Sequence, residues 1–382
     1  MLRRHPWIFS GAIEQTQGDV SPGETVEVYS HKHEWLARGA YSHYSQIKVR
    51  IWTWELNERV DEAFFYQRVQ QAILNRSNLF DLGDTNAYRL VHSESDNLPG
   101  LIVDRYADLI VVQYLASGAE HWREAIGNAI ANVSGIKLLF ERSDADVRKL
   151  EGLPPRVGLL KGGDIADPII IREHGLLYEV NIKTGHKTGF YLDQRHNRLI
   201  ARSLSEGKDI LDCFCYTGGF TLNAGMGNAQ SILALDESEE ALALARNNYV
   251  RNHLDKKTIN QERGDVFTLL RKLRDSGRSF DTIILDPPKF APTIAQVQRA
   301  TRGYKDINLL AMKLLRENGI LVTFSCSGGV SIDLLNKIIA GAGFDSGNNF
   351  QIIGHLHQAA DHPIAINFPE GAYLKGLILR RM

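Results

Sequence analysis

The sequence predicts an α/β fold in which the C-terminal half of the chain forms a doubly wound, Rossmann-like sheet behind an all-β region and a mixed α+β region. From about residue 169, strand-like and helix-like segments alternate, which is typical of a mostly parallel sheet covered by helices. Before residue 60, short β-branched and aromatic runs are separated by turn residues. A chain of 382 residues is also too long for one ordinary core, so two or three domains are expected.

The N-terminal part of the chain divides into two predicted domains. Residues 1–60 are expected to be all-β, with strands at Glu24–Ser30, Trp35–Ser42 and Ile47–Trp54. Residues 61–168 are expected to form an α+β domain with helices at 61–79 and 119–133 and strands at 101–104, 109–115 and 137–142. The Gly- and Pro-rich stretch Leu153–Pro168 is expected to be the loop that leaves this domain.

The C-terminal domain is predicted to span residues 169–382. It should begin with a short strand pair and a helix at about Leu192–Leu204. The expected strands are Asp209–Cys213, Ser231–Asp236, Asn260–Arg263, Phe280–Asp286 and Ile320–Ser325, with helices at Glu239–Val250, Val266–Asp275 and Lys305–Arg316. Ser238 should cap the start of the first of these helices, and Asn318-Gly319 should end the last. Two late strands, Gln351–His355 and Tyr373–Arg380, could pair antiparallel at one edge.

Composition excludes several classes of protein. Hydrophobic residues make up 43% of the chain and charged residues 23%, as in soluble globular proteins. No apolar run is long enough to span a membrane, and no apolar segment follows the charged N-terminus as in a secretory signal. Three cysteines exclude a disulfide scaffold and suit the cytoplasm. Because the net charge is −1, binding of nucleic acid would need local basic patches.

Acidic residues and a glycine turn stand at the carboxyl ends of successive predicted strands, where open α/β sheets bind ligands. The turn lacks the G-x-G-x-x-G spacing that cradles a pyrophosphate. S-adenosylmethionine has a ribose and an adenine but no phosphate, so it suits this edge. One such Asp alone would more often be a helix cap or a solvated strand end, but four in register favour a cofactor site. The cofactor-binding candidates are Asp212, Phe214, Tyr216, Gly218, Asp236, Glu237, Asp265 and Val266.

The candidate catalytic residues are Asp286 and Cys326. Asp286 opens an Asp-Pro-Pro turn after the fourth strand, and Cys326 follows the fifth, so both should flank one pocket. An Asp-Pro-Pro-aromatic turn usually signals methylation of an exocyclic amine, but here Lys289 holds the aromatic position and Phe290 comes one place later. A thiolate that adds to C6 of cytosine makes C5 nucleophilic, which is covalent catalysis of C5 methylation. Asp286 could then bind the N3/N4 edge of the base.

The other cysteines and three histidines have plainer interpretations. Most free cysteines are small buried hydrophobes, and we interpret Cys213 and Cys215 in that way, whereas the position of Cys326 favours a nucleophile. His355, His357 and His362 form a loose group near the C-terminus. Loop or substrate contacts suit them better than a metal site, and no metal is expected.

Four basic residues without an acidic one lie between Pro287 and Lys305, beside the predicted pocket. Lys289, Arg299, Arg302 and Lys305 are therefore RNA-binding candidates, although a basic run is more often a solvated face. Arg271, Lys272 and Arg274 are interpreted as solvated surface. A weaker signal lies in the first domain, where Arg3, Arg4, Lys48 and Arg50 stand among the aromatic residues Trp7, Phe9, Trp52 and Trp54.

Several motifs together resemble the ribosomal RNA large subunit methyltransferase I family, bacterial enzymes that methylate C5 of a cytosine in 23S rRNA. The similarity runs over nearly the whole chain. It is carried by Leu2-Arg3-Arg4-His5-Pro6-Trp7-Ile8-Phe9-Ser10-Gly11, Gly185-His186-Lys187-Thr188-Gly189-Phe190-Tyr191-Leu192-Asp193-Gln194-Arg195, Phe214-Cys215-Tyr216-Thr217-Gly218-Gly219-Phe220, Asp286-Pro287-Pro288-Lys289-Phe290 and Phe324-Ser325-Cys326-Ser327.

The resemblance implies an N-terminal PUA barrel, a central α+β domain and a C-terminal class I S-adenosylmethionine-dependent methyltransferase domain. It also implies that Cys326 is the nucleophile and that the segment Lys187–Arg195 helps to close the cofactor site, which adds Lys187, Thr188 and Phe190 to the cofactor-binding candidates. Family members usually carry about a dozen residues ahead of the Leu-Arg-Arg-His-Pro-Trp motif, and these form a strand of the barrel. The first strand is therefore apparently missing here: either the start of the sequence is assigned late, or the barrel lacks an edge strand.

Three alternatives stay open at this point. A related guanine methyltransferase of the ribosome would share the sheet and the Asp-Pro-Pro turn but would need no thiol. A non-catalytic RNA-binding or ribosome-assembly factor could retain the fold without cofactor affinity. A nicotinamide dehydrogenase is disfavoured because the phosphate cradle is absent.

Overall fold

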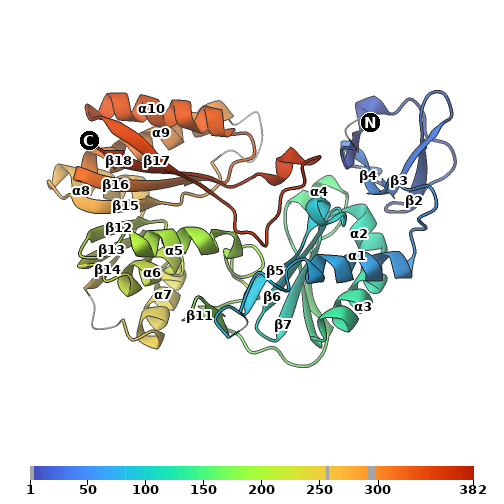
Figure 1. The fold of residues 1–382 in the computed structure, drawn as a ribbon, viewed down its shortest axis with the longest axis horizontal. Coiled ribbons are helices and arrows are strands. Elements are labelled where there is room, and N and C mark those ends of the chain that lie inside the picture. Colours follow the sequence, from blue (N-terminus) through green and yellow to red (C-terminus); the bar gives the residue numbers. More distant parts are fainter. Residues whose placement is uncertain (1–3, 82, 255–257, 291–296) are drawn as a thin grey trace. The chain divides into compact units, whose positions relative to one another are not determined.

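The computed structural model of the protein describes residues 4–81, 83–254, 258–290 and 297–382. The chain divides into two compact units (Figure 1). The first comprises Met1–Asp193 together with Ala360–Gly371, and the second comprises Gln194–Ala359 together with Ala372–Met382. In the described residues, no helix has both the length and the apolar character needed to cross a membrane.

The first unit begins with a four-stranded antiparallel sheet in the order β1-β4-β3-β2. Its elements are β1 (Trp7–Phe9), the 3-10 turn η1 (Ser10–Ala12), β2 (Thr25–Tyr29), β3 (Trp35–Tyr41) and β4 (Ile47–Thr53). The three strands predicted for this region are confirmed, and β1 was not predicted. Ile8, Ala37, Val49 and Ile51 form its small buried core. The predicted residues Met1, Leu2 and Arg3 lie outside the described residues.

The rest of the first unit is built on a five-stranded sheet in the order β5-β6-β7-β8-β9, in which only β7 and β8 run parallel. Its strands are β5 (Ala87–His92), β6 (Leu101–Tyr106), β7 (Leu109–Tyr114), β8 (Leu138–Ser143) and β9 (Arg156–Lys161). A separate antiparallel pair consists of β10 (Ile169–Glu173) and β11 (Leu176–Val180). The helical segments are α1 (Glu62–Leu74), η2 (Ser93–Asp96), α2 (Ser117–His121), α3 (Arg123–Ser134) and α4 (Val147–Leu150).

One prediction for this region is confirmed with a break, and another is wrong. The helix expected over 119–133 is two helices, because the backbone at Trp122 leaves the helical conformation and the indole packs 5.0 Å from the Phe65 ring. The stretch Leu153–Pro168, expected to be a loop, contains β9, which pairs with β8. Most residues of β9 are exposed, so this edge strand depends on main-chain pairing and leaves little hydrophobic pattern in the sequence.

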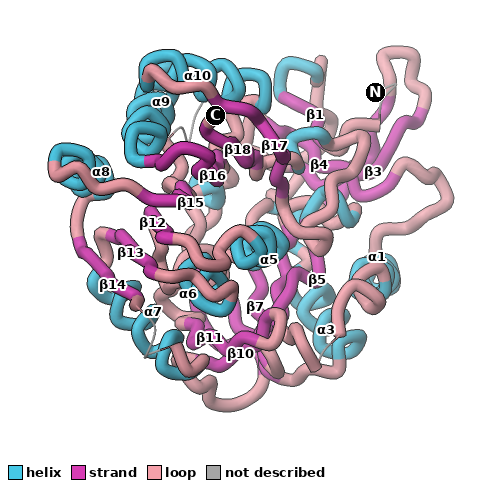
Figure 2. Tube along the Cα trace, turned by 60° about the vertical axis from the view of Figure 1, so that its left-hand side comes forward, coloured by secondary structure: helices cyan, strands magenta, loops and turns pink. Residues whose placement is uncertain are grey.

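The second unit is a seven-stranded sheet in the order β14-β13-β12-β15-β16-β18-β17 (Figure 2). The strands are β12 (Asp209–Cys213), β13 (Ser231–Asp236), β14 (Ile259–Arg263), β15 (Phe280–Leu285), β16 (Leu315–Ser325), β17 (Phe350–His357) and β18 (Lys375–Arg381). The first five are parallel, and β18 joins β16 and β17 antiparallel. The predicted doubly wound sheet with an antiparallel edge is therefore confirmed.

Helices cover both faces of this sheet. On one face lie α5 (Arg195–Ser203), which follows the 3-10 turn η3 (Leu192–Gln194), then α6 (Gly219–Met226) and α7 (Glu239–Arg251); on the other lie α8 (Val266–Asp275), α9 (Val297–Leu314) and α10 (Ile332–Ser346) (Figure 1). Alternate strand residues feed the two cores: Ile210 packs toward α5 and α6, and Leu211 packs toward α8 to α10. Ser238 caps α7 as predicted, by accepting a hydrogen bond from Ala241 N.

The predicted end of the last helix is wrong. Asn318-Gly319 was expected to cap a helix over Lys305–Arg316, but α9 starts earlier and ends at Leu314, and Leu315 already pairs with Phe280 in β15. The register between β15 and β16 then shifts, and Asn318 adopts a left-handed conformation with φ of 61°. The Asn-Gly pair thus marks an irregularity inside a strand. The helices α6 and α10 were not predicted.

Candidate active site at the carboxyl edge of the seven-stranded sheet

Asp212 is a fully buried carboxyl group in β12. Its Oδ2 accepts a hydrogen bond from Thr221 Oγ1 in α6 at 2.6 Å, and its Oδ1 has no hydrogen-bond partner among the described residues. Burial, together with the nearby Asp286 and Asp236 carboxylates, raises the pKa of Asp212 to about 7, against the opposing effect of the hydrogen bonds from Thr221. A buried acceptor of this kind suits a cationic group of a ligand.

The turn after β12 has an unusual backbone conformation. Phe214 and Tyr216 are left-handed, with φ of 63° and 48°, a conformation that non-glycine residues rarely adopt and that clusters at functional sites. Gly218 follows with φ of 79°, and a Cβ there would come within 2.8 Å of the Tyr249 ring, so glycine is required. These three cofactor-binding candidates therefore form one tight turn between β12 and α6.

Asp236, at the end of β13, ties this turn to the neighbouring strand. Its Oδ2 accepts from Tyr216 N and its Oδ1 accepts from Ser238 N, both at 2.9 Å. A carboxylate has about four acceptor sites, so both oxygens can also accept hydrogen bonds from the hydroxyl groups of a ligand. Glu237, the next residue, is exposed, and its carbonyl accepts from Arg263 Nε at 3.1 Å.

The cofactor-binding candidates Asp265 and Val266 serve to cap and to pack the helix α8. Asp265 caps α8, because its Oδ1 accepts from Thr268 N at 2.8 Å and from Thr268 Oγ1 at 2.6 Å. The Val266 side chain is buried in the core under α8. The four acids are also not level: Asp212 pairs with Ala234 and Ile284, so it lies two residues deeper in the sheet than Asp236 and Asp286.

Asp286 follows β15 and is held by a chain of amide groups. Gln194 Nε2 donates to Asp286 Oδ2 at 3.0 Å, and Asn197 Nδ2 donates to Gln194 Oε1 at 2.6 Å and to the His357 carbonyl at 3.1 Å. Because Gln194 Oε1 accepts from Asn197, its NH₂ group must face Asp286. Neither amide was a predicted site residue, although Gln194 lies in a motif that carries the family resemblance.

Cys326 differs from the other two cysteines, although none of the three forms a disulfide. It follows β16, beside β15, and is partly exposed. Cys213 and Cys215 are buried, and burial raises the pKa of both thiols. The structural interpretation of those two cysteines agrees with their burial.

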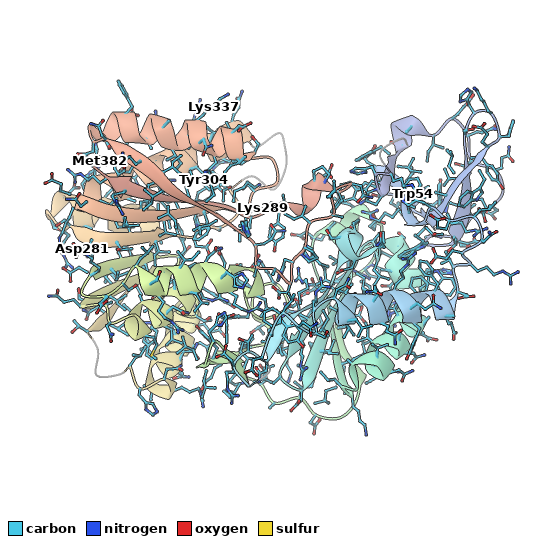
Figure 3. The ribbon with its side chains drawn as sticks, viewed as in Figure 1. Trp54, Asp281, Lys289, Tyr304, Lys337 and Met382 are labelled. Carbon is cyan, nitrogen blue, oxygen red and sulfur yellow. The ribbon has the colours of Figure 1, made fainter. Side chains whose placement is uncertain are left out.

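The turn after Cys326 is fixed from α9 and β18. Tyr304 (labelled in Figure 3) has its OH 3.0 Å from Ser327 Oγ, and the centre of its ring lies 4.8 Å from that of the Phe290 ring. Lys375 Nζ donates to the carbonyls of Ser327 and Val330. Tyr304 and Lys375 were not recognised in the sequence, because only the pairing of distant segments brings them to this turn.

The predicted RNA-binding residues lie on the turn after β15 and on α9. Lys289, Arg299 and Arg302 are exposed. Lys305 is half-buried and forms an ion pair with Asp345 at 2.7 Å, so its charge is partly neutralised. Residues 291–296, which belong to the same predicted basic run, lie outside the described residues.

The candidates Lys187, Thr188 and Phe190 belong to the first unit. Thr188 Oγ1 donates to the buried Asp104 at 2.6 Å, and Phe190 N donates to Tyr106 OH at 3.2 Å. Lys187 Nζ forms an ion pair with Asp193 at 2.6 Å and lies 4.4 Å from the centre of the Tyr191 ring. Their predicted role toward the cofactor stays a prediction, since these contacts fasten the segment within its own unit.

The remaining candidates contribute little to a site. Arg50 and Trp52 are buried, as expected for core residues. Arg50 forms an ion pair with Glu151 at 2.8 Å. His362 is buried beside Asp361 in the first unit, whereas His355 and His357 lie in β17 of the second. Among the described residues, no group of three or more His, Cys, Asp or Glu side chains could hold a metal ion.

These residues fit S-adenosylmethionine. Its ammonium group would donate a hydrogen bond to Asp212 Oδ1, and its ribose hydroxyls would donate to Asp236, beside the Phe214–Gly218 turn. Carboxylate oxygens accept hydrogen bonds from the hydroxyl and ammonium groups of this cofactor. Because the cofactor carries no phosphate, the site does not need a loop of backbone N–H groups to bind one.

Comparison with known proteins agrees with this fit. The model of a PUA-like domain matches residues 1–54, and the model of the S-adenosylmethionine-dependent methyltransferase family matches residues 157–346. A solved methyltransferase structure from Streptococcus mutans aligns with a TM-score of 0.86 and 22% identity, covering 99% of this chain and 96% of that one. Another, a methyltransferase complexed with S-adenosylhomocysteine, aligns with a TM-score of 0.87 and 22% identity, with the same coverage.

Curated relatives are much more similar in sequence. The ribosomal RNA large subunit methyltransferase I of Shewanella amazonensis is 50% identical over 99% of this chain and 96% of its own length. The protein of the same name from Escherichia coli O139:H28 is 48% identical over 100% of this chain and 96% of its own length. S-adenosylmethionine is therefore the cofactor, and the chain belongs to the ribosomal RNA large subunit methyltransferase I family.

Proposed function

We propose that the protein transfers a methyl group from S-adenosylmethionine to C5 of a cytosine in large-subunit ribosomal RNA, with Cys326 as the nucleophile. One observation carries the proposal: the partly exposed cysteine of this chain stands at the end of β16, next to the strand that leads into Asp286. The relatives named as large-subunit rRNA methyltransferases support the choice of RNA.

The proposed reaction proceeds through a covalent adduct. The Cys326 thiolate adds to C6 of the cytosine, which breaks the C5–C6 double bond and makes C5 electron-rich. S-adenosylmethionine, when bound, supplies the electrophilic methyl group that C5 takes up. Loss of the C5 proton to a base and expulsion of the Cys326 thiolate then restore the C5–C6 double bond and free the enzyme.

Asp286 is proposed to select the base. The Gln194 amide donates to its Oδ2, and a hydrogen bond to the ionised form favours the carboxylate. An ionised Asp286 accepts a hydrogen bond from the exocyclic N4 amino group of cytosine, which uracil lacks. We further propose that the exposed Lys289, Arg299 and Arg302 contact phosphates that flank the base.

The first test is methyl transfer from labelled cofactor to unmodified large-subunit rRNA, followed by nucleoside analysis. We expect the label in 5-methylcytidine, and we expect Cys326→Ala to reduce transfer by several orders of magnitude because the nucleophile is removed. Cys213→Ala is the matched control, since that thiol is fully buried, and its activity per folded molecule should stay close to wild type.

A second readout traps the adduct. RNA with 5-fluorocytidine at the target cannot lose fluorine as a cation, so the bond from sulfur to C6 should persist as a protein–RNA band in a denaturing gel. This band should be absent with Cys326→Ala. Label in guanine, or full activity of Cys326→Ala, would refute the C5 mechanism, and absence of measurable cofactor binding would favour a non-catalytic RNA-binding factor.

We also propose that the sequence is organised as three domains, residues 1–60, 61–168 and 169–382, with residues 169–193 and 360–371 of the third packing in the first compact unit. The PUA-like match over 1–54 supports the first boundary, and the end of the five-stranded sheet at Lys161 supports the second.

A further inference from the structure

The proposed reaction needs Cys326 as a thiolate. An ordinary cysteine thiol has a pKa of about 8.5, so at neutral pH it is mostly protonated and poorly nucleophilic. A positive charge close to the sulfur is the usual means of stabilising the thiolate. The residues next to Cys326 in the sequence carry no positive charge, and the turn after Asp286 carries only that of the exposed Lys289.

Lys375 is brought to this turn by strand pairing. It is the first residue of β18, and it stands opposite Ser325, the last residue of β16, in the antiparallel register. Its Nζ donates to the Ser327 carbonyl at 3.1 Å and to the Val330 carbonyl at 2.9 Å. An ammonium has three N–H donors, so these two bonds fasten the turn after Cys326 and leave a third donor.

The charge of Lys375 is coupled to Cys326. Partial burial lowers the pKa of the Lys375 ammonium, the Cys326 sulfur raises it, and the nearby Lys289 ammonium lowers it. The energy between two charges belongs equally to both partners, so an ammonium that the thiolate stabilises must in turn stabilise the thiolate. Because Lys375 is half-buried, water screens this interaction less than it would at an exposed lysine.

The other titratable groups around this turn differ in their effect. Burial raises the pKa of Tyr304 on α9, its hydrogen bonds to Ser325 and Ser327 lower it, and Cys326 raises it, so the phenol is a neutral neighbour at physiological pH. His357 of β17 pairs opposite Lys375, and its Nδ1 lies 2.8 Å from the Gln358 carbonyl. The acidic group of the neighbouring strand end, Asp286, already accepts from Gln194 and would oppose a thiolate.

We propose that Lys375 is a positioning residue for the nucleophile: its ammonium holds the turn after Cys326 in place and stabilises the thiolate form of Cys326. The proposal rests on the function proposed for Cys326 above. It explains how a thiol beside the Asp286 carboxylate can be reactive, since the cation on β18 offsets the acid on the other side.

The pH dependence of alkylation tests this proposal without RNA or cofactor. The full chain is treated with iodoacetamide at a series of pH values, and modification of the Cys326 peptide is followed by mass spectrometry. The same chain in urea serves as the reference for an unshielded thiol. We expect the midpoint for folded wild type to lie below that of the denatured chain. A midpoint equal to or above the reference would overturn the proposal, with no variant required.

Two variants identify the source of the effect. Lys375→Met keeps the aliphatic stem but removes the charge, and its alkylation midpoint should move up, with a rate at neutral pH about tenfold lower, as for a shift of about one pKa unit. Lys375→Arg keeps the charge and should restore most of the rate. Lys337→Met, at an exposed lysine of α10 (Figure 3), is the matched control and should behave like wild type.

A purely structural Lys375 predicts a different pattern. Lys375→Met would then lower the melting temperature but leave the alkylation midpoint unchanged, and this result would refute the proposal. The thiol titration is also independent of the methylation test. If Cys326→Ala retained activity, the proposed function would fail whatever the titration gives, and a normal midpoint with an inactive Cys326→Ala would refute only the role of Lys375.

Discussion

Two carboxyl groups at the edge of the seven-stranded sheet have different surroundings. Asp286 accepts a hydrogen bond from the Gln194 amide and is partly exposed. Asp212 is fully buried, accepts a hydrogen bond on Oδ2 only, and lies close enough to Asp236 and Asp286 for their charges to raise its pKa. These surroundings support the different roles proposed for the two groups, binding of the base by Asp286 and binding of a cationic group of the cofactor by Asp212.

The behaviour of Asp212 predicts a pH-dependent stability. Burial raises the pKa of Asp212 to about 7, whereas an Asp in an unfolded chain titrates near pH 4, at about 3.9. Between these values the folded state binds the extra proton, so the contribution of Asp212 to stability falls as the pH rises. Asp212→Asn stays neutral. It should melt close to wild type at pH 4, become increasingly more stable than wild type toward pH 7, keep that difference up to pH 8, and bind S-adenosylmethionine more weakly.

Thermal denaturation without cofactor, measured across that pH range, checks this expectation, and calorimetry measures the cofactor affinity. Glu206→Gln is the control, because Glu206 is exposed in the loop before β12, and its melting curve should follow wild type at every pH. A constant offset between Asp212→Asn and wild type at all pH values would contradict the assignment.

At the residue scale, the position of a candidate residue in the fold could be predicted where it lies near a strand end. Asp212, Asp236, Asp286 and Cys326 all stand at the carboxyl edge, because parallel strands deliver their ends to one place. Lys375 could not be predicted in this way. It enters from an antiparallel strand about 50 residues later in the chain, and its contact with the turn after Cys326 depends on the register of β16 and β18.

At the scale of elements, the strong periodic segments were predictable and the irregular ones were not. The bounds predicted for β12, β13 and α8 match the structure, because each has a regular apolar pattern and a clear start. The edge strand β9 and the irregular start of β16 were missed, since main-chain pairing with a neighbour defines them and turn-forming residues interrupt them. A Gly- and Pro-rich stretch or an Asn-Gly pair therefore does not distinguish a loop from an edge strand or from a bulge within a strand.

The packing of β18 against β16 gives a prediction at this scale. A Cβ added at Gly376 would meet two ring carbons of Phe324 at 2.6 and 2.7 Å and the Leu356 Cβ at 2.9 Å. Gly376→Ala should therefore lower the free energy of unfolding by about 1–3 kcal/mol, as overpacking of a core usually does. Gly328→Ala is the control, because nothing lies within 4 Å of a Cβ there. Urea denaturation measures both, and equal losses would refute the packing argument.

At the scale of the molecule, the chain order and the compact units do not coincide. The segment Ala360–Gly371 lies between β17 and β18 in sequence but belongs to the first unit. Asp361 fastens it there: its Oδ2 accepts from Arg89 N at 2.8 Å, and its carbonyl accepts from the buried Arg76 guanidinium at 3.0 Å. The contiguous boundaries predicted from the order of strands, helices and loops could not anticipate this return, because nothing in the local sequence pattern signals a contact with residues more than 250 positions away.

The net charge of −1 gives the last prediction, which concerns RNA binding by the whole molecule. With no overall positive field, affinity must come from a few local phosphate contacts, and each contact contributes about one unit to the slope of log K against log salt. The exposed Arg299 and Arg302 are three residues apart on α9, so they present their charges on one helix face. The double variant Arg299→Ala/Arg302→Ala should weaken binding of large-subunit rRNA fragments and reduce that slope by one to two units.

Fluorescence anisotropy at a series of KCl concentrations measures this slope. The matched control is Lys272→Ala/Arg274→Ala on α8, where Lys272 pairs with Glu262 and Arg274 pairs with Asp275. Both double variants remove two positive charges, so a bulk-charge effect would change their slopes alike. A smaller slope confined to the α9 variant would locate the phosphate contacts on α9, whereas a wild-type slope for the α9 variant would mean that RNA is bound elsewhere on the molecule.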